Sequence, residues 1–189
     1  MTDRDVYIGI DQSVGGFGLC LLFNGETHKF YTEAFPLSKY QGKEVWQLHA
    51  VEDFLINALG GVHDDVKLVA REGFSYGSIQ GREKAGAIAY AVDSTLYEWL
   101  KEPYCYPVIV APTQLKEFAT GSGGASKEDV KKSVDELWNV QLTNDNLADA
   151  YVLAQIAYSL DKDAVTVERQ RSVLESIRNP PNKKKKKAA

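Results

Sequence analysis

Three acidic side chains occupy positions from which carboxylates can act on a ligand. Asp11 ends the apolar run VYIGID, Glu72 ends the run KLVARE, and Asp149 lies in the first turns of the helical segment NDNLADAYVLAQIAY. Ligands of α/β sheets bind at such strand ends. Asp11 follows the apolar residues Ile8 and Ile10, where a carboxylate is costly unless it is paired or bound to a metal ion.

Convergence of these three carboxylates would produce a repulsion that divalent cations relieve. Mg²⁺ or Mn²⁺ suits a site made of oxygen ligands that leaves room for water and phosphate. Two such ions about 4 Å apart can bind the attacking water and the leaving oxygen of a phosphodiester. Each acid also has a structural interpretation: Asp11 as a turn cap, Glu72 as a surface acid, and Asp149 as a first-turn acid favoured by the helix dipole.

The segments that carry these acids predict a mixed α/β sheet. Short apolar runs separated by QSVGG and by the hairpin signal Asn24-Gly25 predict three antiparallel strands, at 6–11, 18–23 and 27–31. Two further strands are expected at 67–72 and just before Pro112. Apolar periodicity and capping residues predict helices at 43–59, 81–101, 112–119, 126–139, 144–160 and 164–177. The fold class is therefore α/β, with three antiparallel strands, then two parallel ones, and helices on both faces.

The composition is that of one globular domain, with 189 residues, 44% of them hydrophobic and 25% charged. No apolar run is long enough for a membrane span, and the start of the chain lacks the pattern of a signal peptide. Cys20 and Cys105 suit packed thiols in a reducing cytoplasm and are too few for a zinc site. The net charge of −4 includes five consecutive lysines, so the remainder carries about −9, which is unusual for a nucleic-acid binder.

Four motifs, taken as a set, resemble those of the RuvC family of Holliday-junction resolvases within the RNase H-like superfamily. IGIDQSVGGFGLCLL resembles the first strand of that family with its catalytic Asp and hairpin. LVAREGFSYG resembles the second acidic strand and the aromatic-bearing loop after it. VIVAPTQLKEFATGSGGASKEDV resembles a strand, turn, glycine loop and second lysine, and NLADAYVLAQIAY resembles the final acidic helix. The resemblance covers about residues 6–160 in the right order.

The resemblance implies a catalytic site that binds Mg²⁺, with Mn²⁺ as a substitute and two ions per active site. Its catalytic metal ligands would be Asp11, Glu72 and Asp149. The family commonly has a further acid or a histidine three residues before the last Asp, and here that position is Asn146. An amide oxygen is a weaker ligand than a carboxylate, and the adjacent Asp145 is an alternative. Either Asn146 or Asp145 would then complete the set of metal ligands.

The resemblance also implies which residues contact DNA. Lys116 and Lys127 match the two lysines that the family places near the scissile phosphate. Phe74 or Tyr76 would match the loop aromatic that stacks against bases near the branch point, a role that any base permits. Other contacts in this acidic protein are expected at Arg82 and Lys84, with binding that weakens steeply as salt rises.

Members of the RuvC family are homodimers that nick two opposing strands of a four-way junction. Helix 81–101 would be the interface, because its apolar stripe exceeds what one sheet face needs; the alternative is that it packs wholly within the monomer. The expected organisation is a nuclease domain at 1–160, a helical extension at 161–178 and a disordered lysine-rich tail at 179–189, which either solubilises the protein or binds phosphate. The compartment would be a bacterial cytoplasm, or a host cytoplasm if a bacteriophage encodes the chain.

Three other functions compete with a junction resolvase. The opening hairpin also resembles that of actin-like ATPases and sugar kinases, although those proteins need a second domain of this kind. Asn146 favours a catalytically inactive DNA-binding relative. An RNase H-like nuclease that cuts RNA–DNA hybrids or other branched DNA is the third alternative.

Overall fold

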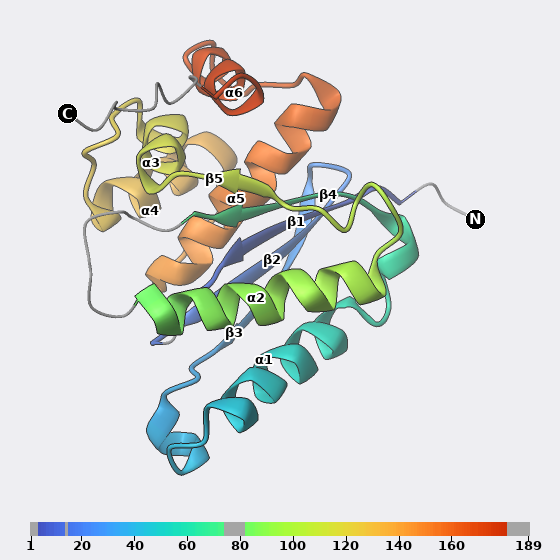
Figure 1. Ribbon diagram of the computed structural model, residues 1–189. Coiled ribbons are helices and arrows are strands. Elements are labelled where there is room, and N and C mark those ends of the chain that lie inside the picture. Colours follow the sequence, from blue (N-terminus) through green and yellow to red (C-terminus); the bar gives the residue numbers. More distant parts are fainter. Residues whose placement is uncertain (1–3, 14, 74–81, 181–189) are drawn as a thin grey trace, which may run out of the picture.

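The computed structural model describes residues 4–13, 15–73 and 82–180, and the side chains of 82–84 lie outside that description. Its centre is a five-stranded sheet in the order β3-β2-β1-β4-β5 (Figure 1). The strands are β1 (Val6–Asp11), β2 (Phe17–Phe23), β3 (Thr27–Glu33), β4 (Val66–Glu72) and β5 (Val108–Val110). The first three pair antiparallel, whereas β4 pairs parallel with both β1 and β5. The predicted fold class is confirmed.

Helices cover both faces of the sheet and form two hydrophobic cores (Figure 1). One face carries α1 (Glu44–Leu59) and α2 (Arg82–Trp99). The other face carries α5 (Asp145–Lys162), surrounded by α3 (Pro112–Thr120), α4 (Lys127–Trp138) and α6 (Gln170–Arg178). Two short 3₁₀ helices, η1 (Leu37–Tyr40) and η2 (His63–Asp65), lie in the connections. None of the helices in the described ranges combines the length and hydropathy that a membrane crossing needs.

The alternation of side-chain direction along β1 determines which of its residues face α5. Val6, Ile8 and Ile10 belong to the core beneath α1 and α2, whereas Tyr7 belongs to the core beneath α5. Because successive side chains of a strand point to opposite faces, Asp11 shares the face of Tyr7. The strand therefore delivers its terminal carboxylate to the side of the sheet that α5 covers.

Gly9 lets α5 lie directly on β1. A Cβ atom at Gly9 would stand 1.9 Å from the carbonyl oxygen of Ala150 and 2.4 Å from the amide nitrogen of Ala154. Both are backbone atoms, so no side-chain movement could make room for the methyl group. The glycine and the two alanines thus set a close crossing of strand and helix, and Asp149 is next to Ala150 at that crossing.

The C-terminal extension differs from the sequence prediction. Helix α5 continues to Lys162, and Asp163 then adopts the left-handed conformation with φ 51°. The final helix begins at Gln170 and not at Ala164. The reason is that Gln170 Oε1 accepts hydrogen bonds from the backbone N–H groups of Thr166 and Val167, which holds the intervening segment as a turn. The apolar periodicity was correct for the later half of the segment only.

Helix α2 packs as in the alternative that the sequence left open. Its apolar stripe packs within this chain, because Ile88, Val92 and Leu96 are buried together with α1 and the sheet. That stripe therefore gives no argument for a dimer. The exposed apolar residues of α2 lie elsewhere on the helix: Tyr90 is 74% exposed and Tyr97 is 60% exposed.

Candidate active site

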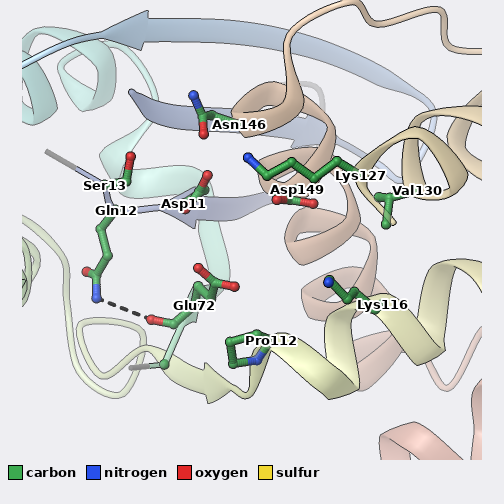
Figure 2. A pocket seen from close by; sticks show the side chains of 11 residues that line it. Asp11, Gln12, Ser13, Glu72, Pro112, Lys116, Lys127, Val130, Asn146 and Asp149 are labelled. Carbon is green, nitrogen blue, oxygen red and sulfur yellow. Dashed lines mark hydrogen bonds between the residues drawn. The ribbon is translucent and has the colours of Figure 1, made fainter. Parts of the chain in front are cut away.

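The acids that the sequence singled out line one pocket with a volume of about 410 Å³. In Figure 2 the carboxylates of Asp11, Glu72 and Asp149 point toward the middle of this pocket, with the ammonium groups of Lys116 and Lys127 at its sides. Asn146 also lines the pocket. The remaining lining residues that the structure describes are Gln12, Ser13, Gly73, Pro112 and Val130.

The parallel pairing of β1 and β4 brings the first two acids together. Ile10 is in register with Arg71, so Asp11 and Glu72 both follow at the carboxyl ends of neighbouring strands. Ala70 lies in the core beneath α5, and Glu72, two residues later, shares that face. The register and the alternation of side chains together account for the convergence of these two carboxylates.

Three helices add the other charged groups. Asp149 comes from the first turns of α5, Lys116 from α3 and Lys127 from the first residue of α4. The start of α4 is fixed by a capping box, in which Ser126 Oγ accepts a hydrogen bond from the Asp129 amide, and Asp129 Oδ2 accepts one from the Ser126 amide. This motif therefore fixes the backbone of Lys127 at the mouth of the pocket.

Burial raises the pKa of all three acids, and the charges of the other pocket acids add to the rise at Asp11 and Glu72. The pKa of Asp11 rises to about 8, chiefly because the group is buried, then because of the charges of Glu72 and Asp149. Burial and the charge of Asp149 raise the pKa of Glu72 to about 7. Burial raises the pKa of Asp149 to about 6, although the charge of Lys127 opposes the rise. Such a cluster holds protons near neutral pH and favours a cation that can replace them.

The carboxylates converge, but they are not arranged as a preformed metal site. In the described part of the chain, no group of three His, Cys, Asp or Glu side chains has the arrangement needed to hold a metal ion. The donor chemistry is nevertheless that of a hard cation, because every acid at the site offers only carboxylate oxygens. The pocket also has the positive charge that a phosphate would need, from Lys116 and Lys127.

Asn146 and Asp145 occupy different places at the start of α5. Asn146 lies at the edge of the pocket against the loop after β1, where a Cβ atom at Gly16 would be 2.2 Å from its Nδ2. Asp145 does not line the pocket, and its carboxylate pairs with Lys131 at 2.9 Å and Lys127 at 3.4 Å. The structure thus gives Asp145 cationic partners, unlike the acids inside the pocket.

The predicted DNA contacts are only partly placed by the structure. Phe74 and Tyr76 lie outside the described residues. Arg82 and Lys84 belong to the first turn of α2, but their side chains also lie outside the description. Lys116 and Lys127 alone among the predicted basic contacts have described side chains, and both line the pocket.

Gln12 and Ser13 are pocket residues that the sequence analysis missed. Gln12 Nε2 donates a hydrogen bond to the Glu72 carbonyl oxygen at 3.2 Å and so links the ends of β1 and β4 (Figure 2). Ser13 Oγ accepts from the Gly16 amide at 3.0 Å and closes the turn into β2. The available signal was their position directly after Asp11, because polar residues that follow a strand-terminal acid face the same edge of the sheet.

A partly buried ion pair supports the strand that carries Glu72. The Arg71 side chain is 8% exposed and binds both carboxylate oxygens of Asp93 on α2, each at 2.8 Å. Arg71 Nη1 also donates to the Glu72 carbonyl oxygen at 3.3 Å. The alternation of side chains places Arg71 on the face opposite Glu72, so its positive charge serves the link to α2.

Comparison with known proteins finds similarity at the level of structure. No protein-family model and no curated protein matches the sequence. The structure of Thermus thermophilus RuvC aligns with a TM-score of 0.62 and 20% identity, over 84% of this chain and 96% of that chain. T. thermophilus RuvC in complex with a Holliday junction substrate aligns with a TM-score of 0.64 and 22% identity, over 80% of this chain and 91% of that chain. The expected RNase H-like architecture is thereby confirmed: this chain has the fold of RuvC.

Proposed function

We propose that this chain is a metal-dependent endonuclease that resolves four-way DNA junctions by hydrolysing phosphodiester bonds. The observation that carries the proposal is the pocket itself, where one buried and two half-buried carboxylates meet two lysines at the carboxyl ends of β1 and β4. The fold shared with RuvC supports the same function, since one of those RuvC structures contains a Holliday junction substrate. The motif resemblance agrees with both.

Asp11, Glu72 and Asp149 would hold the metal, and the raised pKa of each is the observation that the residues fit a cation. Mg²⁺ is the proposed ion, with Mn²⁺ as a substitute and two ions per site. Bound there, the metal would activate water and stabilise negative charge on the phosphate oxygens. Asn146, at the edge of the pocket, is placed to add a weaker amide oxygen.

The other side chains of the pocket have roles that follow from their charge and position. The Lys116 and Lys127 ammonium groups would attract the phosphate and hold it against the carboxylates. Gln12 keeps the ends of β1 and β4 together through its bond to the Glu72 carbonyl oxygen. A water activated by the metal would be the nucleophile, so the hydrolysis proposed needs no covalent intermediate with the protein.

A homodimer is also proposed, on evidence different from the stripe used in the sequence analysis. Tyr90 and Tyr97 lie two helical turns apart and are exposed on the same side of α2. The Tyr97 ring lies 6.3 Å from that of Tyr106, which is itself 58% exposed. Aromatic residues gathered on one surface are typical of interfaces. A twofold dimer would present two pockets to a junction with the same symmetry.

Cleavage of defined substrates tests the proposed function. A labelled four-way junction, a linear duplex and an RNA–DNA hybrid would be incubated with the protein and Mg²⁺, Mn²⁺ or EDTA. We expect symmetric nicks in the junction with either metal, none with EDTA, and none by Asp149→Asn. Asp53→Asn removes an exposed acid from α1 and should cut normally. Cleavage of the hybrid alone would indicate a different RNase H-like nuclease, and tight junction binding without cleavage would indicate an inactive relative.

Lys116→Ala is expected to weaken junction binding and to reduce its dependence on salt. One fewer phosphate contact should lower the slope of log K against log salt by about 1. Binding isotherms at several salt concentrations, in Ca²⁺ or EDTA so that no cleavage occurs, measure this slope. Lys132 is an exposed lysine of α4 that does not line the pocket, and Lys132→Ala should change the slope less. Equal slopes for the wild type and Lys116→Ala would remove Lys116 from the phosphate site.

A further inference from the structure

The start of α5 carries an acid whose environment differs from that of the pocket acids. Asp145 is the first residue of α5, and Asp149 follows one helical turn later on the same side. Asp149 is half-buried in the pocket and its pKa is raised. The pKa of Asp145 is lowered instead, chiefly by its hydrogen bond with Lys131. Two acids one turn apart therefore have different surroundings, because Asp149 lines the pocket and Asp145 is paired with Lys131 beside it.

The partners of Asp145 both come from one face of α4. Lys127 and Lys131 are separated by four residues, so their side chains lie on the same side of that helix. Asp145 Oδ1 lies 2.9 Å from the Lys131 ammonium, and Oδ2 lies 3.4 Å from the Lys127 ammonium. One carboxylate thus joins two lysines, of which only Lys127 lines the pocket.

Exposure distinguishes the two lysines. The Lys131 side chain is 16% exposed and is also held by Glu128 at 2.8 Å, so it forms a fixed anchor. The Lys127 side chain is 62% exposed, and its long, flexible stem would otherwise sample many rotamers. Its charge acts on Asp11, Glu72 and Asp149 alike. The position of this one ammonium therefore affects the whole carboxylate cluster.

We infer that Asp145 is a positioning residue, anchored by Lys131, that holds the Lys127 ammonium at the mouth of the pocket, and that it is not a metal ligand. The inference rests on the proposed function in one respect, because the group that Lys127 meets there would be a DNA phosphate. Cations bound by the carboxylates would weaken the attraction between these groups and Lys127. Asp145 would then keep the ammonium near the pocket, ready for the phosphate.

The central test is Asp145→Asn, which keeps the shape of the side chain and removes its charge. Single-turnover cleavage of the four-way junction at saturating protein and metal should slow by about two- to five-fold, the factor expected for losing a partly exposed ion pair. Junction affinity should stay equal or increase slightly, since the change removes a negative charge. A merely structural defect would not produce this split between binding and cleavage. Asp145→Glu, which keeps the charge, should recover most of the rate.

Three comparisons make the result decisive. In a Lys127→Met background, Asp145→Asn should have no further effect on the rate. Mn²⁺ affinity, measured by titration without DNA, should change by less than about three-fold, whereas loss of a direct ligand should cost at least ten-fold. Glu136→Gln breaks an exposed pair with Lys132 on the same helix and should leave rate, DNA affinity and metal affinity unchanged. A ten-fold loss of Mn²⁺ affinity, or an undiminished effect in Lys127→Met, overturns the inference.

The ion pairs that tie Asp145 to Lys127 and Lys131, the tether, can be measured even if the chain cuts no junction. The ¹³Cε signals of lysines in the free protein report the surroundings of each ammonium group, and Asp145→Asn should shift those of both Lys127 and Lys131. Glu136→Gln should shift neither. A wild type that cuts nothing, together with these shifts, refutes the proposed function and retains the tether. A wild type that cuts junctions while Lys127 is unaffected by Asp145→Asn retains the function and refutes the tether.

Discussion

Asp11→Asn is expected to abolish junction cleavage and, in the absence of metal, to make the protein more stable. Loss of the most buried carboxylate of the cluster should slow cleavage by about 10³-fold or more. The same change relieves the cost of a charge that burial and two neighbouring acids oppose. We expect a gain of about 2 kcal/mol in unfolding free energy near pH 8, or about 4–8 °C in melting temperature.

The pH dependence of this gain identifies its cause. A carboxyl whose pKa is about 8 in the folded protein and near 4 in the unfolded chain binds more protons when folded, so its cost grows as pH rises between those values. Melting curves in EDTA should therefore coincide for the wild type and Asp11→Asn near pH 4 and separate progressively up to pH 8. Saturating Mg²⁺ should reduce or reverse the difference, because only the wild type gains the full binding energy.

Asp5→Asn is the matched control for that experiment. Pairing with Lys162 at 2.8 Å lowers the pKa of Asp5, so this acid stabilises the fold above its unfolded pKa. Its removal should lower the melting temperature at pH 7 and have little effect below pH 3, which is the opposite sign. Equal melting temperatures for the wild type and Asp11→Asn from pH 4 to 8 would show that the pocket acids are not under electrostatic strain.

The local patterns of the sequence were sufficient to predict the sheet and the three acids that meet in the pocket. Asp11 and Glu72 could be identified because each ends an apolar run, and the order of the elements required β1 and β4 to be parallel neighbours. Asp149 could be identified because it lies beside the apolar side of an amphipathic segment. These inferences depend on periodicity and chain order, which the sequence contains explicitly.

Contacts between distant segments could not be predicted in the same way. Nothing in the spacing of Asp145 and Lys131 shows that they meet across two helices, so the sequence left Asp145 as an alternative metal ligand. The apolar stripe of α2 suggested an interface, because the sequence does not show how much of α2 is covered by α1. The helix predicted at 164–177 begins only at Gln170, because the side chain of Gln170 accepts a hydrogen bond from the backbone of Thr166. Apolar periodicity contains no sign of such a bond.

The close crossing of β1 and α5 was another feature hidden from sequence reasoning, and it leads to the second large expected effect. Gly9→Ala should destabilise the protein by about 3 kcal/mol and lower cleavage by the folded fraction by about 100-fold. The added methyl group would overlap the backbone of Ala150 and Ala154, so α5 must move away from β1. Because Asp149 is next to Ala150, that movement separates it from Asp11.

Two other glycines separate loss of stability from displacement of the site. Gly25 has φ 79° and lies against the Tyr158 ring, so Gly25→Ala should also destabilise the protein, but at the hairpin joining β2 and β3. Its folded fraction should cut at the normal rate. Gly86 lies within α2 with open space at its Cβ position, and Gly86→Ala should be neutral or stabilising. Denaturant unfolding and single-turnover cleavage should be measured on all three variants. Together they show whether the distance between β1 and α5 sets the cleavage rate. Normal cleavage by folded Gly9→Ala would show that it does not.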